Sequence, residues 1–333
     1  MTAGKVDMDV YRKLLNKKVG MTVAHNLNKE NPTEVKEWIP TGSRWLDSII
    51  CRGQLAGIPV GKITEIAGLE ASGKSFMAAQ IAGNAQKMGI RVAYFDAESA
   101  IDPTFLAKAG CNVDDLLYVQ AASVEKVFEM IETLLADEEK WLFIWDSLAH
   151  TPAEKDVEGD FNPQSSMAMK ARILSKAFSK VTIPLANTQS TFLIVNQLKT
   201  NITSNIAEAM TTPYFTPGGK AAHYTYSLRI WLTARKAKAA YILDSNGVRI
   251  GSEVKVKLEK SRFGSAGRTC NFKLLWGQQV GIQDEESWLD AIKGSERLKT
   301  GGAWYTLTSK EGREFKFQLK QWVEKLQDPE FRQ

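Results

Sequence analysis

The 333 residues are enough for one large domain with appendages or for two small ones. Hydrophobic residues make up 44% of the chain and no apolar run approaches the ~20 residues that span a bilayer, which argues against a membrane protein. The net charge of +5, from 43 basic and 38 acidic residues, permits a nucleic-acid partner but does not require one. Three widely separated cysteines and an N-terminus without the apolar core of a signal peptide predict a cytoplasmic protein.

The first part of the chain predicts a lead-in segment followed by alternating strands and helices. Residues 1–40 contain a short amphipathic helix around Val10–Leu15 and a polar stretch that ends at Asn31-Pro32. Strands that are apolar throughout and joined by helices predict a parallel sheet covered on both faces. The strands are expected at 63–68, 91–98, 116–120, 141–147 and 191–197, and the helices at 74–88, 124–135 and 167–185.

The pattern changes after Gln197. Residues 198–220 predict a polar loop. Three strand-like runs follow, at 224–235, 253–262 and 269–276, with turn residues between them, and they predict an antiparallel extension of the sheet. Beyond Trp276 the sequence predicts a small helix-rich tail that includes QWVEKLQ, residues 321–327.

GLEASGKS, residues 68–75, has the spacing of a phosphate-binding loop and lies between a predicted strand and a predicted helix. Its glycines would let backbone N–H groups converge on phosphate oxygens, with the helix N-terminus adding positive potential. Lys74 would meet the outer phosphates and the Ser75 hydroxyl would ligate Mg²⁺. The alternative is a plain glycine-rich turn before a helix. We expect a site for ATP and Mg²⁺.

Three further strand ends carry polar side chains that could act on this nucleotide. Asp146 is placed to hold Mg²⁺ through water, although a helix cap or turn former is the alternative. Glu98 could activate water for attack on the γ-phosphate, or cap the next helix. Gln197 could sense the γ-phosphate and pass its state to the loop behind it, or form a turn.

These stretches, in this order, resemble the RecA family of homologous-recombination ATPases, with its bacterial and phage UvsX-type members. The resemblance runs from IPTGSRWLDSII to about Trp304-Tyr305 and includes AYFDAESAIDP, IWDSLAHTPAE, IVNQLK and TPGGKAAHY. It implies an N-terminal oligomerisation segment at 1–40, a RecA-type ATPase core with two DNA-binding loops at 41–276, and a small α+β C-terminal domain at 277–333. Unlike bacterial members, the sequence ends at QDPEFRQ without a long acidic tail, so regulation through such a tail is not expected.

The resemblance also implies roles for individual residues. Glu98 stands at the family's catalytic glutamate, Lys74 at its phosphate-loop lysine, and Gln197 at the residue that couples ATP to DNA. Lys260 and Arg262 stand where the family places cations that reach the neighbouring subunit's ATP, in a form, EKSR, that looks phage-like; a solvated strand face is the alternative. Asp102, Phe105 and Trp276 match positions beside the adenine, where core packing is the alternative for the rings. The remaining nucleotide contacts would be made by Gly68, Leu69, Glu70, Ala71, Ser72, Gly73, Ser75, Phe76 and Asp146.

Two stretches resemble the family's DNA-binding loops. EGDFNPQSSMAMKAR resembles the first loop and the start of its helix. KTNITSNIAEAMTTPYFTPGGKAAH resembles the second loop, with a poor match between Ile202 and Phe215. Contacts with phosphates would supply affinity without reading sequence. An exposed surface loop is the alternative for both. The implied DNA contacts are Met167, Arg172, Ser175, Lys180, Lys199, Gly218, Gly219 and Lys220.

The sequence therefore predicts an ATP-dependent recombinase that polymerises on single-stranded DNA and exchanges strands with duplex DNA. Expected partners are further copies of the chain, a single-strand-binding protein and a loader. A RecA-fold replicative helicase is the main alternative, but 40 lead-in residues are too few for its extra domain. A zinc-bearing RecA paralogue would need a cluster of four cysteines, which this sequence does not contain. A small-molecule kinase would not need the paired amides of Asn196 and Gln197, and a non-catalytic DNA-coating filament would not need Glu98.

Overall fold

The computed structural model describes residues 7–20, 22–51, 55–99, 101–158, 163–202, 205–234, 240–264, 266–276 and 280–332. The chain divides into two units, Met1–Glu37 and Trp38–Gln333. In the first unit, helix α1 (Met8–Val19) confirms the helix expected around Val10–Leu15. Asp7 caps its start, Gly20 ends it with φ 75°, and its apolar side chains are all exposed.

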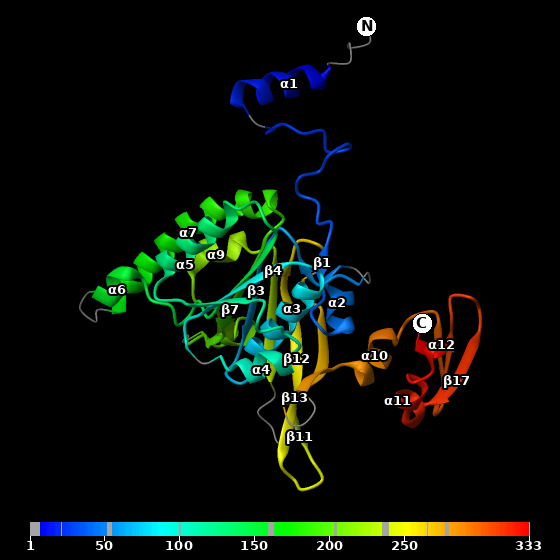
Figure 1. The fold of residues 1–333 in the computed structure, drawn as a ribbon. Helices are drawn as coiled ribbons and strands as arrows, with labels where there is room; N and C mark the ends of the chain where they lie inside the picture. The colour runs from blue at the N-terminus through cyan, green and yellow to red at the C-terminus, as the bar shows by residue number, and fades with distance from the viewer. Residues whose placement is uncertain are drawn as a thin grey trace. The chain divides into compact units, whose positions relative to one another are not determined.

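The second unit is organised around one mixed sheet, with strand order β14-β13-β12-β10-β3-β7-β6-β4-β5 (Figure 1). The strands from β10 to β5 are parallel to one another, and β12, β13 and β14 add an antiparallel edge. This confirms the mostly parallel sheet and its antiparallel extension. The strands are β3 (Ile63–Gly68), β4 (Arg91–Asp96), β5 (Leu116–Gln120), β6 (Trp141–Asp146), β7 (Thr191–Gln197), β10 (Leu228–Ala234), β11 (Tyr241–Leu243, paired with β12), β12 (Arg249–Ser261), β13 (Thr269–Trp276) and β14 (Val280–Gln283).

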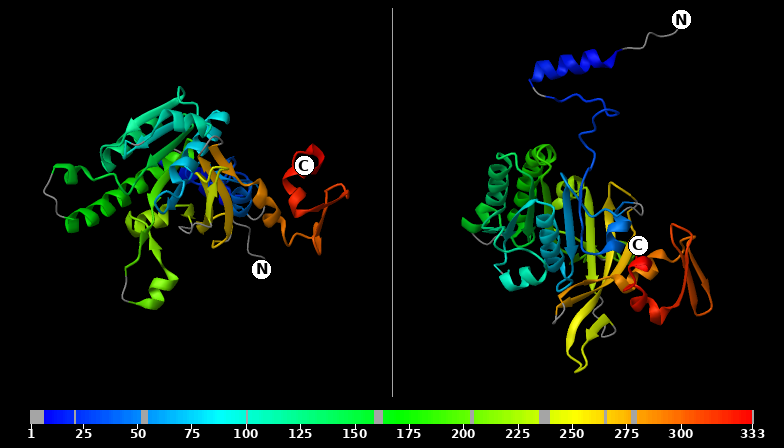
Figure 2. Two further views of the ribbon diagram at one scale, coloured as in Figure 1. Left: turned by 90° about the horizontal axis from the view of Figure 1, so that it is seen from below. Right: turned by 45° about the vertical axis from the view of Figure 1, so that its right-hand side comes forward.

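Helices cover both faces of this sheet because its central strands are apolar on both sides. On β7, Leu193 and Val195 face one apolar cluster, and Phe192 and Ile194 face the other. The first cluster includes α2 (Arg44–Ile50), α3 (Lys74–Lys87) and α4 (Pro103–Lys108). The second includes α5 (Val124–Leu135), α7 (Pro163–Asn187) and α9 (Gly219–Thr225), of which α5 and α7 lie side by side (Figure 2).

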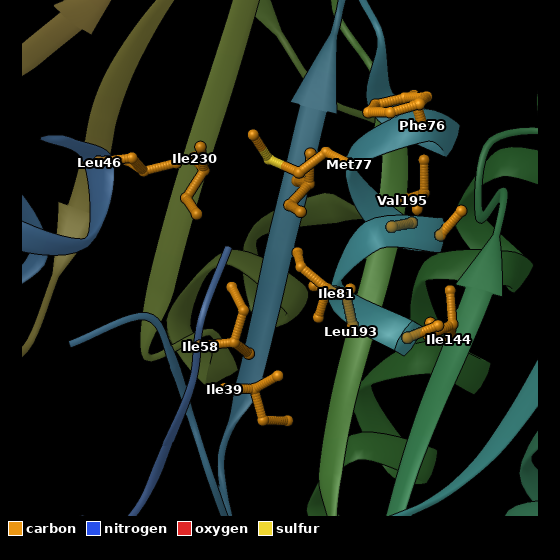
Figure 3. Packing of buried hydrophobic residues seen from close by; sticks show 14 of the residues in the cluster. Ile39, Leu46, Ile58, Phe76, Met77, Ile81, Ile144, Leu193, Val195 and Ile230 are labelled. Atoms are coloured by element: carbon orange, nitrogen blue, oxygen red, sulfur yellow. The ribbon is translucent and has the colours of Figure 1, made fainter. Parts of the chain in front are cut away.

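Helix α3 is held on the sheet by its apolar residues. Met77 and Ile81 pack toward the strands that carry Ile144, Leu193 and Ile230 (Figure 3). All five side chains are at most 1% exposed. Because α3 begins at Lys74, this packing fixes the phosphate loop at the carboxyl end of β3.

Several element boundaries differ from the sequence predictions. Helix α7 begins at Pro163, earlier than expected, since proline suits the first position of a helix. The predicted polar loop 198–220 contains β8 (Lys199–Thr200), α8 (Ile206–Thr211) and β9 (Tyr214–Phe215), and its last residues belong to α9. Backbone pairing of β8 with β9 closes this segment at its base. The remaining short elements before the tail are β1 (Trp38–Ile39), β2 (Ile58–Pro59) and α6 (Glu154–Glu158).

The helices expected in the C-terminal tail are present, but strands that the helical pattern did not predict accompany them. The tail contains a three-stranded antiparallel sheet with its own apolar cluster around Phe317, Trp322 and Phe331, which fits the small α+β domain implied by the resemblance. The alternating pattern of the strands, interrupted at Gly312, is the sequence signal for this sheet. Its elements are α10 (Glu285–Ile292), β15 (Leu298–Gly301), β16 (Trp304–Thr308), β17 (Glu314–Gln318), a 3₁₀ turn (Leu319–Gln321), α11 (Trp322–Lys325) and α12 (Pro329–Arg332). In the described ranges, none of the helices combines the length and apolarity of a membrane span.

Candidate nucleotide site and DNA loops

The phosphate loop connects β3 to α3 and depends on two glycines. A Cβ at Gly68 would lie 2.3 Å from Ser72 Oγ and 2.9 Å from the Leu232 carbonyl oxygen. A Cβ at Gly73, where φ is 88°, would lie 2.2 Å from a methyl carbon of Leu274. Glycine is therefore favoured at both positions, at Gly68 by the nearby backbone of Leu232 and at Gly73 by the left-handed backbone conformation.

Two polar side chains of the loop region lack the acceptors that a phosphate group would supply. The Ser72 hydroxyl is buried and has no hydrogen-bond partner among the described residues. Lys74 Nζ turns back to donate to the Leu69 carbonyl oxygen at 2.9 Å. Burial lowers the Lys74 pKa, while Asp146, Glu98 and Glu70 act in the opposite direction. A polyphosphate would give both side chains oxygen acceptors, so these residues fit ATP.

Asp146 lies at the end of β6, beside the start of α3. Its Oδ2 accepts a hydrogen bond from Tyr94 Oη at 2.9 Å, and the Ser75 hydroxyl donates to the same carboxylate. Burial raises the Asp146 pKa, and these two hydrogen bonds oppose that rise. No group of three His, Cys, Asp or Glu side chains in the described part of the chain could enclose a metal. Ser75 and Asp146 therefore fit Mg²⁺ that is held largely by phosphate oxygens and water.

Glu98 lies on the loop after β4, which Asp96 holds in place. Asp96 Oδ1 accepts from the backbone N–H groups of Glu98 and Ser99, each at 2.9 Å. A cavity of about 220 Å³ is lined by Ser75, Asp96, Glu98, Ile101, Phe105 and Asp146. The structure thus brings Glu98, Ser75 and Asp146, which are distant in sequence, to one cavity.

His150 was not predicted from the sequence, and it contacts two of the predicted residues. Its Nδ1 lies 2.5 Å from Glu98 Oε1. Gln197 Nε2 lies 3.3 Å from Nδ1 and 3.4 Å from Nε2 of the same ring. The Ser147 hydroxyl donates to Glu98 Oε1 at 3.1 Å. A single histidine has no spacing rule that would have marked it in advance.

A second cavity, of about 390 Å³, adjoins the phosphate loop. Besides residues 71–76 it is lined by Phe105, Arg249, Leu274 and Trp276. Phe105 and Trp276 therefore face one space, and their place beside a base stays a prediction. Asp102 is not among the lining residues; its carboxylate accepts from the Thr104 N–H at 2.9 Å and caps α4.

Arg249 lines this cavity and, like His150, was not predicted from the sequence. Its guanidinium carbon lies 3.9 Å from the ring centroid of Tyr241 and 5.0 Å from that of Trp276. The side chain reaches the cavity from the first residue of β12. Only the pairing of β11 with β12 and of β12 with β13 brings the three side chains together.

Lys260 and Arg262 line neither cavity. Lys260 Nζ donates to the carbonyl oxygens of His223 and Tyr224, at 2.7 and 3.1 Å, and Arg262 donates to that of Tyr224 at 2.8 Å. Burial, followed by the charges of Arg262 and Arg229, lowers the Lys260 pKa. Both cations thus meet carbonyl groups at the C-terminal end of α9, away from the chain's own phosphate loop.

The predicted DNA contacts lie on α7 and around β8 and α9. Arg172, Ser175 and Lys180 are on α7, and Lys180 forms an ion pair with Glu132 at 2.7 Å. Met167 is also on α7, but its side chain lies outside the described residues. Lys199 and Lys220 are exposed. Gly218 and Gly219, with φ of 116° and 77°, open α9.

A phosphate loop after a parallel strand, with an acidic residue at the end of a second strand, defines a P-loop ATPase. The RecA N-terminal domain family model matches residues 7–282. Protein RecA of Streptomyces avermitilis is 32% identical over 277 residues, which are 83% of this chain and 70% of that protein. Protein RecA of Bifidobacterium breve is 32% identical over 302 residues, which are 91% of this chain and 73% of that protein. Protein RecA of Symbiobacterium thermophilum is 33% identical over 274 residues, which are 81% of this chain and 73% of that protein. The chain belongs to the RecA family; it is a RecA-type recombinase and a DNA-dependent ATPase.

Proposed function

We propose that the protein polymerises on single-stranded DNA with ATP and Mg²⁺ between subunits, admits a duplex, and exchanges strands where the bases are complementary. A single-strand-binding protein and a loader would assist it in the cytoplasm of a bacterium or of a phage-infected host. The observation that supports this best is the position of Gln197. It ends the strand beside β3, contacts the surroundings of Glu98 through His150, and leads directly into the predicted second DNA loop.

In the proposed reaction, water attacks the γ-phosphorus and the bond to the β–γ bridging oxygen breaks, which yields ADP and phosphate. Lys74 and the N–H groups of the loop hold the phosphates, and Glu98 accepts the proton of the attacking water. Ser75 would ligate Mg²⁺ and Asp146 would hold it through water. When bound, Mg²⁺ would offset the negative charge that builds up on the phosphate oxygens.

The adenine would lie between Phe105 and Trp276, because stacking needs only the face of a ring. Asp102 would approach the base from the start of α4. Gly68 to Gly73 in the loop and Phe76 in α3 would form the remaining wall of the nucleotide site. Lys260 and Arg262 would leave the carbonyl groups of α9 and reach the ATP of the neighbouring subunit, which would make hydrolysis dependent on assembly.

DNA would be held by the two loop regions, mostly through its phosphates. Arg172, Ser175 and Lys180 would follow the strand along α7, with Met167 placed against the bases. Lys199, Lys220 and the N–H groups of Gly218 and Gly219 would contact it from the second loop. ATP binding would order these loops through Gln197, and hydrolysis would release them and drive filament turnover.

The N-terminal segment would serve assembly of the subunits. The exposed apolar face of α1, which includes Val10, Tyr11, Leu14 and Leu15, suits packing on a neighbouring subunit, so we assign residues 1–40 to oligomerisation. The core would extend over 41–276 and the C-terminal domain over 277–333.

Transfer of a labelled strand from a short duplex to a homologous single strand tests the proposal. We expect transfer that needs ATP, Mg²⁺ and homology, and that is lost in Lys74→Ala. Unwinding of a forked duplex without a homologous acceptor, together with no transfer, would support the helicase alternative and overturn the proposal.

A further inference from the structure

We propose that His150 is a positioning residue that joins the carboxylate of Glu98 to the amide of Gln197. Through this link, the orientation of Glu98 for hydrolysis would depend on the state of the second DNA loop. The inference rests on the proposed function, since it takes Glu98 as the residue that activates water and Gln197 as the one that leads to DNA.

The hydrogen bonds around the ring define its tautomer. A carboxylate can only accept, so the 2.5 Å contact with Glu98 Oε1 places a proton on His150 Nδ1. Gln197 Nε2 lies almost equally far from both ring nitrogens, 3.3 Å from Nδ1 and 3.4 Å from Nε2. In the neutral ring only Nε2 can accept a hydrogen bond from this amide, because Nδ1 carries the proton. In this tautomer the imidazole would connect the Gln197 amide, as donor, to the Glu98 carboxylate, as acceptor.

Burial does little to fix the orientation of the His150 ring. Its side chain is 46% exposed and Glu98 is 40% exposed, so burial contributes little to either orientation. Ser147 Oγ lies 3.0 Å from His150 Nδ1 and donates to Glu98, so it supports the same arrangement.

The turn that carries His150 is also tied to the helix after the first DNA loop. Lys170 Nζ on α7 donates to the carbonyl oxygens of Leu148 and Thr151, at 2.7 and 2.6 Å. The Leu148 N–H donates to the Val195 carbonyl oxygen on β7 at 3.1 Å. His150 therefore sits on a turn held from α7 on one side and from the strand of Gln197 on the other.

Replacement of the ring by His150→Phe tests the link, because it keeps the size and loses both hydrogen bonds. We expect the ATPase kcat in single-stranded DNA to fall roughly ten- to hundred-fold, the cost of a misplaced catalytic group. The KM for ATP should change less than about twofold, because the ring does not line the loop cavity. His150→Asn, which retains a donor near the Nδ1 position, should restore much of the rate.

Two further variants distinguish the failure of this inference from failure of the proposed function. Glu98→Gln should keep DNA-bound filaments and lose turnover; normal turnover would overturn the role of Glu98 itself. His150→Phe in a Gln197→Ala background should add little further loss if the ring acts through Gln197. If Glu98→Gln loses ATPase activity while His150→Phe keeps the full rate, the inference is overturned and the role of Glu98 stands. Equal losses of ATPase rate in His150→Phe and His150→Asn would also overturn the inference.

Discussion

Arg229 Nε lies 2.6 Å from Glu65 Oε2, in an ion pair between neighbouring strands of the central sheet. The two side chains are 9% and 0% exposed. The same glutamate accepts from Asn196 Nδ2 at 2.9 Å, and Arg229 donates to Thr216 Oγ1 at 2.9 Å. The pair thus joins the strand of the phosphate loop to the segment that precedes α9.

Arg229→Met should destabilise the fold by roughly 3–5 kcal/mol, because it leaves a buried carboxylate without its cation. Glu65→Leu combined with Arg229→Met should recover most of this free energy, since similar apolar side chains replace both charges. The free energy of unfolding in urea measures both effects. A double variant as unstable as the single one would show that Glu65 is not the reason for the loss.

Gly73→Ala should weaken ATP binding. The added methyl group would displace the end of the Leu274 side chain, which lines the cavity beside the loop, and φ at Gly73 is 88°. Gly294→Ala is the matched control: its φ is 92° and no atom lies within 4 Å of the added carbon. Both changes carry a backbone cost of roughly 1–2 kcal/mol, but only Gly73 lies in the phosphate loop. Titration with a fluorescent ATP analogue should show weakened binding in Gly73→Ala alone; equal binding in the two variants would contradict the geometry of the loop.

Trp276→Ala should raise the KM for ATP about tenfold, which corresponds to the loss of one stacked ring. Trp304→Ala is a close control, because both tryptophans are 42% exposed and only Trp276 lines the cavity beside the loop. Steady-state ATPase kinetics with saturating single-stranded DNA would measure the difference. A similar KM in the two variants would remove Trp276 from the base site.

Asp47 makes stability depend on pH. Burial raises its pKa to about 7, and hydrogen bonds from the Thr41 hydroxyl and N–H oppose the rise. The folded state thus binds more protons than the unfolded state between about pH 4 and pH 7, and the Asp47 contribution to stability falls as pH rises through that range. Asp47→Asn stays neutral and accepts the same bonds. Its advantage over the original protein should be small at pH 4 and reach a few kcal/mol at pH 8. A difference independent of pH would contradict the raised pKa.

The nucleotide loop was predictable because its spacing is fixed by phosphate geometry, and the strand and helix around it follow from apolar patterns. Asp146 and Glu98 could be placed at strand ends, but the cavity they share depends on the register of three parallel strands. His150 and Arg249 were beyond prediction. Each is a single polar side chain whose partners come from other strands, so no local pattern marks it.

The buried charges of Glu65 and Arg229 were likewise hidden, because each interrupts an otherwise apolar strand and only the pairing of β3 with β10 explains both. The C-terminal sheet was missed for a different reason. Its strands are short and half-exposed, so the alternation of apolar and polar residues covers only a few positions in each strand. The helical pattern of residues 321–327 therefore dominated the prediction.

The rate of ATP hydrolysis with and without single-stranded DNA tests the central claim most directly, with Lys74→Ala as the blank. We predict strong stimulation by DNA that disappears in Lys74→Ala, and loss of stimulation in Gln197→Ala although ATP still binds. Hydrolysis that depends on Lys74 but is indifferent to DNA would contradict the proposed coupling of the nucleotide site to the DNA loops.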